Sequence, residues 1–164
     1  MDHSERGETV THREFAVAVE TYGDMVFRVA FSSLGRREDA EDVTQEVLLK
    51  LWRADKDFAS REHMRFWLIR VTVNECRRAA RWYRRNIPVE EVPERPDAPE
   101  SRELLDTVMG LPEKLRVAAY LFYYEGYSTR EIARLVSVPE ATVRSRLSRA
   151  REKLRSILKE EENL

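Results

Sequence analysis

The sequence has few of the residues on which disulfide, metal and β-rich structures depend. Its single cysteine, Cys76, excludes an intrachain disulfide framework. The three histidines are scattered and have no partner cysteine, so we expect no metal site and no cofactor. With only five glycines and six prolines among 164 residues, the composition is typical of an all-helical protein with few turns.

Long apolar runs and catalytic motifs are also missing. Residues 1–14 are polar and charged, unlike a signal peptide, and no apolar run approaches the roughly 20 residues needed to span a bilayer. The sequence contains no phosphate-cradling glycine loop, histidine–cysteine cluster or plausible catalytic triad. We therefore expect a soluble, cytoplasmic protein that is not an enzyme and does not insert into a membrane.

Charged residues, by contrast, are abundant and unevenly placed. They make up 36% of the chain, although the net charge is only −1. Positive charge gathers at 77–85 and 144–159, and negative charge gathers at 38–46 and 90–103. Segregation of this kind is typical of a protein that offers separate faces to separate partners.

A proline-rich segment divides the chain into two halves. Residues 86–101 contain five acidic residues, which keep the segment solvated, and four prolines, which forbid a continuous helix: Pro88, Pro93, Pro96 and Pro99. We interpret this segment as a flexible linker. The sequence therefore predicts an all-α fold of two small helical domains, with a first domain at 1–87, a linker at 88–100 and a second domain at 101–164.

Capping residues and apolar stripes predict most of the helices. In the first half these helices begin at the capping box of Thr11 and Glu14, span 39–53 with Asp39 as the cap, and span about 62–85. In the second half, two helices are expected at 101–110 and 112–126.

The segment 128–158 carries the clearest motif. Ser128 and Glu131 form a capping box for a short helix, and Pro139 stands at the expected first position of a longer one. Ser137 occupies the turn, where glycine is common, and serine can adopt a left-handed or bridge conformation there at some cost. The longer helix has an apolar stripe surrounded by arginines and lysines, which predicts a helix-turn-helix unit that binds DNA. The alternative is an amphipathic surface helix with a solvated basic face.

Two surfaces of the first half also suggest partners. Leu49 lies in the middle of a polar helix face, among Asp42, Gln45 and Glu46. It is either the apolar centre of a protein interface or an ordinary exposed leucine.

On the third helix, one stripe that includes Cys76 is expected to be core, so we interpret Cys76 as a small buried hydrophobe.

An adjacent arc of the third helix combines aromatic and cationic side chains: Trp67, Arg70, Asn74, Arg77, Arg78, Arg81 and Arg85. Guanidinium groups hold phosphates, and aromatic rings accept unstacked bases for roughly 1–3 kcal/mol each. This arc therefore suits single-stranded or partly opened nucleic acid. The alternative is a solvated arginine face with tryptophans packed beneath it.

Two stretches together resemble bacterial RNA polymerase sigma factors. DAEDVTQEVLLKLWR followed by FWLIRVTVNECRR is similar to their second region, and LPEKLRVAAYLFYYEGYSTREIARLVSVPEATVRSRLSRAREKLR is similar to their fourth. With only these regions and a short linker, the chain resembles the extracytoplasmic-function (ECF) group. The resemblance covers residues 15–158 and departs from the family pattern at Ser137, Glu75 and Cys76.

The resemblance implies partners for each surface. Core polymerase would be bound at its β′ clamp helices through Asp42, Gln45, Glu46 and Leu49, with the β flap as a further contact. The promoter −10 element would be recognised and melted by Trp67, Arg70, Asn74, Arg77 and Arg78. The −35 element would be read by Arg144, Ser145, Arg146, Ser148 and Arg149. The resemblance also implies an anti-sigma factor that holds the protein inactive. The alternative function is a stand-alone helix-turn-helix regulator that binds an operator without polymerase.

Overall fold

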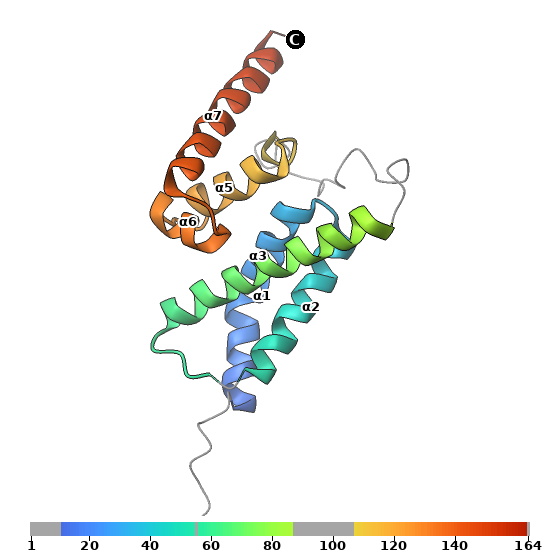
Figure 1. The fold of residues 1–164 in the computed structure, drawn as a ribbon, viewed down its shortest axis with the longest axis vertical. Coiled ribbons are helices and arrows are strands. Elements are labelled where there is room, and N and C mark those ends of the chain that lie inside the picture. The colour runs from blue at the N-terminus through green and yellow to red at the C-terminus, as the bar shows by residue number, and fades with distance from the viewer. Residues whose placement is uncertain (1–10, 55, 87–106, 164) are drawn as a thin grey trace, which may run out of the picture.

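A computed structural model describes residues 11–54, 56–86 and 107–163 of the chain. Its helices are α1 (His12–Leu34), α2 (Arg37–Arg53), α3 (Arg61–Asn86), α5 (Glu113–Tyr123), α6 (Thr129–Val136) and α7 (Glu140–Glu162) (Figure 1). No strand occurs within the described ranges, and the all-α fold is confirmed. The linker predicted at 88–100 lies outside the described residues. So does most of the helix expected at 101–110, of which residues 107–109 form a helical turn.

Both predicted capping boxes are present. At the start of α1, the Glu14 N–H donates to the Thr11 hydroxyl at 3.3 Å, and the Thr11 N–H donates to the Glu14 carboxylate at 2.8 Å. At the start of α6, the corresponding distances between Ser128 and Glu131 are 3.2 and 2.8 Å. Each box satisfies two backbone donors that the helix itself leaves unpaired.

The start of α2 differs from the prediction. We expected Asp39 to be the cap, but the helix begins at Arg37, and Arg36 occupies the N-cap position without a side-chain capping bond. Asp39 instead lies in the first turn, where its negative charge is favourable at the positive end of the helix dipole. Arg37 and Glu38 are therefore also helical, and the helix begins two residues earlier than predicted.

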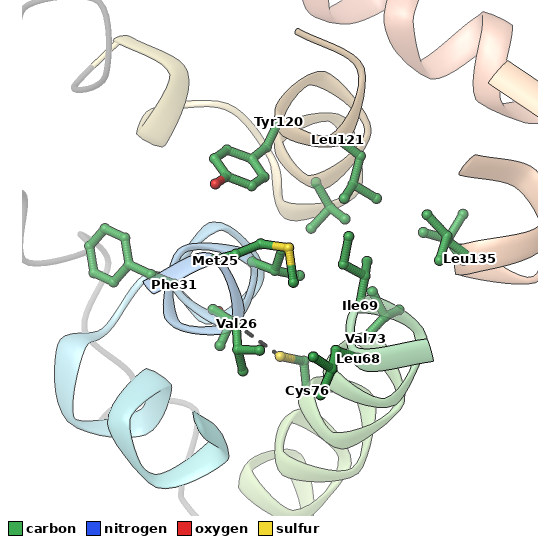
Figure 2. Close-up of a cluster of buried hydrophobic side chains, with 14 of the residues drawn as sticks. Met25, Val26, Phe31, Leu68, Ile69, Val73, Cys76, Tyr120, Leu121 and Leu135 are labelled. Atoms are coloured by element: carbon green, nitrogen blue, oxygen red, sulfur yellow. Dashed lines mark hydrogen bonds between the residues drawn. The ribbon is translucent and has the colours of Figure 1, made fainter. Parts of the chain in front are cut away.

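The first half is a bundle of α1, α2 and α3, which all pack against one another. Fully buried side chains meet at its centre, including Val29 from α1, Leu51 from α2 and Leu68 from α3. Cys76 is buried here as predicted, with its sulfur 4.0 Å from the Ala30 carbonyl oxygen (Figure 2). Burial raises the pKa of the Cys76 thiol to about 12, so Cys76 acts as a small apolar side chain.

The second half contains the predicted helix-turn-helix unit, formed by α6 and α7. Ser137 adopts the left-handed conformation, with φ 56° and ψ 49°, and its N–H donates to the Ala133 carbonyl. Pro139 precedes α7 instead of being its first residue, and its carbonyl accepts the N–H groups of Thr142 and Val143. The preceding helix, α5, ends at Tyr123 and is shorter than expected.

The two halves pack against each other. Helix α1 lies against α5, and α3 lies against α6 (Figure 1). A continuous cluster of buried side chains joins Met25 of α1 and Ile69 of α3 to Leu121 of α5 and Leu135 of α6 (Figure 2). Burial of apolar surface therefore holds the halves together in this arrangement.

Candidate polymerase and promoter interfaces

The outer face of α2 carries the candidate polymerase contacts. Asp42, Gln45 and Glu46 are exposed, and 43% of the Leu49 surface is accessible to solvent. The opposite face of α2 is core, because Val47 and Leu51 have no accessible surface. Leu49 is thus an apolar side chain set in an acidic, solvent-facing surface, as its periodicity predicted.

Trp52 adds to this face and was missed in the sequence. It follows Leu49 by three residues, a spacing that places both side chains on neighbouring positions of one helix face. Its ring is exposed, and its edge contacts come from His12 at 4.8 Å and Phe15 at 5.0 Å, measured between ring centroids. The three-residue spacing from Leu49 is the sequence signal that places Trp52 on this face.

The outer face of α3 presents most of the candidate −10 contacts to solvent. Arg70, Asn74 and Arg78 are exposed. Glu75 follows Asn74 in the sequence, but its side chain is buried. It accepts a hydrogen bond from Lys50 of α2, and its carboxylate lies 3.7 Å from the Arg78 guanidinium. This ion pair explains why a carboxylate occurs on the inner side of α3.

Two tryptophans of α3, Trp67 of the arc and Trp82 close to it, differ in exposure. The ring of Trp67 is half-buried and packs against Phe58 with centroids 5.3 Å apart. Trp82, one turn beyond Arg78 on α3, is 58% exposed. Trp82 is therefore the more exposed of the two rings, whereas Trp67 belongs partly to the packing beneath the arginines.

The candidate −35 contacts lie on α7. Arg144, Ser145, Ser148 and Arg149 are exposed, and Arg144 pairs with Glu140 at 3.1 Å on the surface. The helix is held in place by its opposite face, where Val143, Leu147 and Ala150 are buried. These exposed side chains form one polar and basic face of α7, and the major groove of B-DNA admits an α-helix.

Arg77 and Arg146 are placed differently from the other candidates. Arg77 of α3 donates to the carbonyl of Val136, the last residue of α6. Arg146 of α7 is half-buried and faces the same region. Burial, together with the nearby charge of Arg77, lowers the pKa of Arg146. The packing of the halves thus brings together a −10 candidate and a −35 candidate, which periodicity did not predict.

Two further arginines that the sequence analysis did not select connect the halves. Arg65 of α3 donates to the Glu125 carboxylate at 2.7 Å and to the Glu125 carbonyl at 3.0 Å. Arg116 of α5 is buried, and its guanidinium donates to the carbonyls of Ser32 and Ser33 at the end of α1. A charged residue within the apolar stretch of α5 was the available signal for Arg116. Nothing in the spacing of Arg65 distinguishes it from a surface arginine.

Within the part of the chain that the structure describes, no three histidine, cysteine or acidic side chains come together as a metal site would require. None of the described helices combines the length and apolar character needed to cross a lipid bilayer.

Comparison with known proteins gives the class of the molecule. Residues 18–86 match the family described as Sigma-70 region 2, and residues 101–154 match the family described as Sigma-70, region 4. The bundle of α1, α2 and α3 thus falls largely within the first match, and α5, α6 and most of α7 fall within the second.

Individual relatives narrow the class to one group. The chain is 32% identical to the ECF RNA polymerase sigma factor SigE of Mycolicibacterium smegmatis, over 85% of this chain and 60% of that protein's length. It is also 32% identical to the ECF RNA polymerase sigma-E factor of Haemophilus influenzae, over 71% of this chain and 72% of that protein. The chain belongs to the ECF group of the sigma-70 family and is an RNA polymerase sigma factor.

A solved structure shares the arrangement. The sigma factor RpoE from Bartonella quintana, in complex with the anti-sigma factor NepR, superposes with a TM-score of 0.67 at 25% identity. The match covers 90% of this chain and 98% of that one. A stand-alone operator-binding regulator is therefore not the favoured interpretation.

Proposed function

We propose that the chain binds core polymerase through the outer face of α2 and brings it to promoters whose two elements contact α3 and α7. One observation carries this proposal. Side chains suited to DNA are exposed on helices of two separate halves, namely Arg70 and Asn74 on α3 and Arg144 and Arg149 on α7. The polymerase then carries out the chemistry of transcription, and the sigma factor places the polymerase at the promoter.

The polymerase contact is centred on Leu49. An exposed leucine within an acidic face combines an apolar anchor with charges that orient a basic partner. The β′ clamp helices are the partner we propose for this face, with the β flap meeting the second half. Trp52, exposed beside Leu49, would enlarge the apolar centre.

At the −10 element, we infer that Asn74 captures a base taken out of the opening duplex while Arg70 and Arg78 hold phosphates. Unstacking a base costs a few kcal/mol, so melting requires contacts that exist only in the open state. At the −35 element, Arg144 and Arg149 would contact base edges and phosphates of intact duplex, with Ser145 and Ser148 alongside.

An anti-sigma protein is a further proposed partner, by similarity to the Bartonella RpoE–NepR complex. The proposed place of action is the cytoplasm, because the polymerase and the promoter are there. The packed arrangement is compatible with an inactive state of the sigma factor, because Arg77 donates a hydrogen bond to the Val136 carbonyl in this arrangement and is not available to DNA.

In vitro transcription with core polymerase over a promoter library tests the proposal. Added chain should select promoters that share two short elements, and purified chain alone should bind those duplexes poorly. A chain that failed to bind core polymerase but bound a duplex operator as a dimer would contradict the proposal.

A substitution at Arg149 separates DNA reading from polymerase binding. Arg149→Ala removes an exposed guanidinium from α7, and loss of one base-specific contact costs about 1–3 kcal/mol. Transcription that depends on the −35 element should therefore fall about tenfold, with affinity for core polymerase unchanged. Arg155→Ala, further along α7, is the matched control. Equal loss of both activities in Arg149→Ala would contradict base reading.

A further inference from the structure

A cavity lies where the two halves meet. Its volume is about 290 Å³, and its walls come from α3, α5, α6 and α7 together with Ser33 at the end of α1. Apolar side chains, among them Val73 and Val117, form its floor. This volume is close to the lower end of the range for small-molecule sites, roughly 300–1,000 Å³.

The charges around the cavity are mostly positive. Arg77 and Arg81 of α3, Lys114 of α5 and Arg146 of α7 line it, and Glu113 is the acidic residue among its lining side chains. Arg81 and Lys114 are exposed at the rim, whereas Arg77 and Arg146 are half-buried. Among the described residues, four cations and one carboxylate line the cavity, and the cations come from both halves of the chain.

Arg146 forms no ion pair with a carboxylate among the described residues, although the charge of Glu113 acts on it from a longer distance. Its pKa is lowered because it is partly buried and because Arg77 lies nearby, and Glu113 offsets part of this effect. A half-buried guanidinium beside another cation is unfavourable unless an anion compensates both charges.

We propose that this cavity binds a small anion of the phosphate class with at least two negative charges, held between the guanidinium groups of Arg77, Arg81 and Arg146. Guanidinium groups match phosphate oxygens with paired, charge-assisted hydrogen bonds. The apolar floor and the small volume exclude a long polyanion such as duplex DNA while the halves are packed.

Binding at this place has a consequence for transcription, which rests on the proposed function. Arg77 and Arg146 are candidates for the −10 and −35 contacts, so an anion that bridges them favours the packed halves over the promoter-bound form. If the anion binds only the packed form, an anion concentration 100 times its Kd shifts the equilibrium about 100-fold toward that form. The anion is then an inhibitor of promoter engagement.

Calorimetric titration of the full-length chain with pyrophosphate, at ionic strength held constant with chloride, tests the binding. We expect one saturable site per chain. Arg146→Ala and Arg81→Ala should each weaken the affinity about tenfold or more, since each removes a charge-assisted contact. The control Arg155→Ala, an exposed arginine elsewhere on α7, should change the affinity less than about twofold.

Three results would overturn the binding proposal. These are the absence of saturation, an equal loss of affinity in Arg155→Ala, and equal affinity for citrate, which would indicate attraction by charge alone. Inorganic phosphate, titrated in parallel, should bind more weakly than pyrophosphate because it spans fewer of the guanidinium groups.

Hydrogen exchange of α6 amides tests the consequence. Opening of the halves exposes α6, so pyrophosphate at about ten times its Kd for the parent chain should slow exchange there about tenfold in that chain and by at most about twofold in Arg146→Ala. Unchanged exchange despite binding would show that the anion does not stabilise the packed form. Copurification with core polymerase in the absence of pyrophosphate tests the proposed function separately. A failure of anion binding can therefore be distinguished from a failure of the proposed function.

Discussion

At the level of single residues, exposure separates the side chains that hold the fold from those that can meet a partner. Leu49 is 43% exposed, although Val47 and Leu51 on either side of it are completely buried. Steps of two residues on a helix of 3.6 residues per turn reach opposite sides, so neighbouring apolar residues have different roles. The same reasoning explains why Ser145 and Arg149, each two residues from Leu147, face solvent while Leu147 does not.

Replacement of Leu49 by aspartate should weaken binding to core polymerase by about tenfold or more, because it places a charge at the apolar centre of the proposed interface. The melting temperature should change little, since exposed substitutions usually alter stability by less than about 0.5 kcal/mol. A pull-down titration and thermal unfolding measure the two quantities. Leu158→Asp, at a leucine of similar exposure on α7, is the control. A large fall in melting temperature would contradict the assignment of Leu49 to an interface.

The thiol of Cys76 should be unreactive in the folded chain. Burial raises its pKa from the ordinary 9.0 to about 12, so at pH 8 it is neutral and shielded. A disulfide reagent should therefore react slowly at pH 8 and rapidly once urea unfolds the chain; every signal comes from this single cysteine. Between pH 9 and 12 the unfolded chain loses the thiol proton while the folded chain keeps it, so stability should fall as pH rises. Fast reaction in the native state would contradict the burial.

At the level of helices, capping residues predicted most of the helix starts. They failed at α2, where the position of the preceding turn competed with the capping residue. Thr11 and Ser128 cap their helices as predicted, because a hydroxyl followed three residues later by glutamate satisfies the first backbone donors. Asp39 has the chemistry of a cap but lies in the first turn, because the chain turns at Gly35, four residues earlier, with φ 72°. The position of a turn therefore decided the helix start.

The left-handed Ser137 gives a test of the helix-turn-helix turn. A side chain in this conformation costs roughly 1–2 kcal/mol, and glycine avoids that cost. Ser137→Gly should therefore raise the free energy of unfolding by about 0.5–1 kcal/mol, as measured by urea denaturation. The matched change Ser145→Gly, inside α7, should lower it by about 0.5–1 kcal/mol. Destabilisation by Ser137→Gly would contradict the left-handed turn.

At the level of the whole molecule, the main finding is that the halves share a core. Sequence periodicity predicts that Ile69, Leu121 and Leu135 are buried, but not that they contact each other across the two halves. The proposed function requires the halves to separate in order to reach two promoter elements, so the packed form would be one state of a protein that also needs an open one. Substitution of the polar residues at the rim of this core should therefore shift the equilibrium between the packed and the open form.

The pair of Arg65 and Glu125 joins the halves and should contribute to the packed form. Removal of either side chain leaves a partly buried charge without its partner, so Arg65→Ala and Glu125→Ala should each lower stability by about 1–3 kcal/mol. The double variant should lose less than the sum of the two, with a coupling of about 0.5–3 kcal/mol in urea denaturation. Additive losses would show that the pair is not formed in solution. The surface pair of Arg37 and Glu41 is the control, with coupling of at most about 0.5 kcal/mol.

The sequence by itself determined most of the helix starts, the buried Cys76 and the exposed Leu49. These follow from neighbours within one turn of helix, where spacing and capping chemistry are local. Only the tertiary structure decided that Arg77 and Arg146 face one cavity, that Arg65 meets Glu125, and that one core spans both halves. Those contacts join residues about 60 or more positions apart, and helical periodicity carries no information about which helix face meets which.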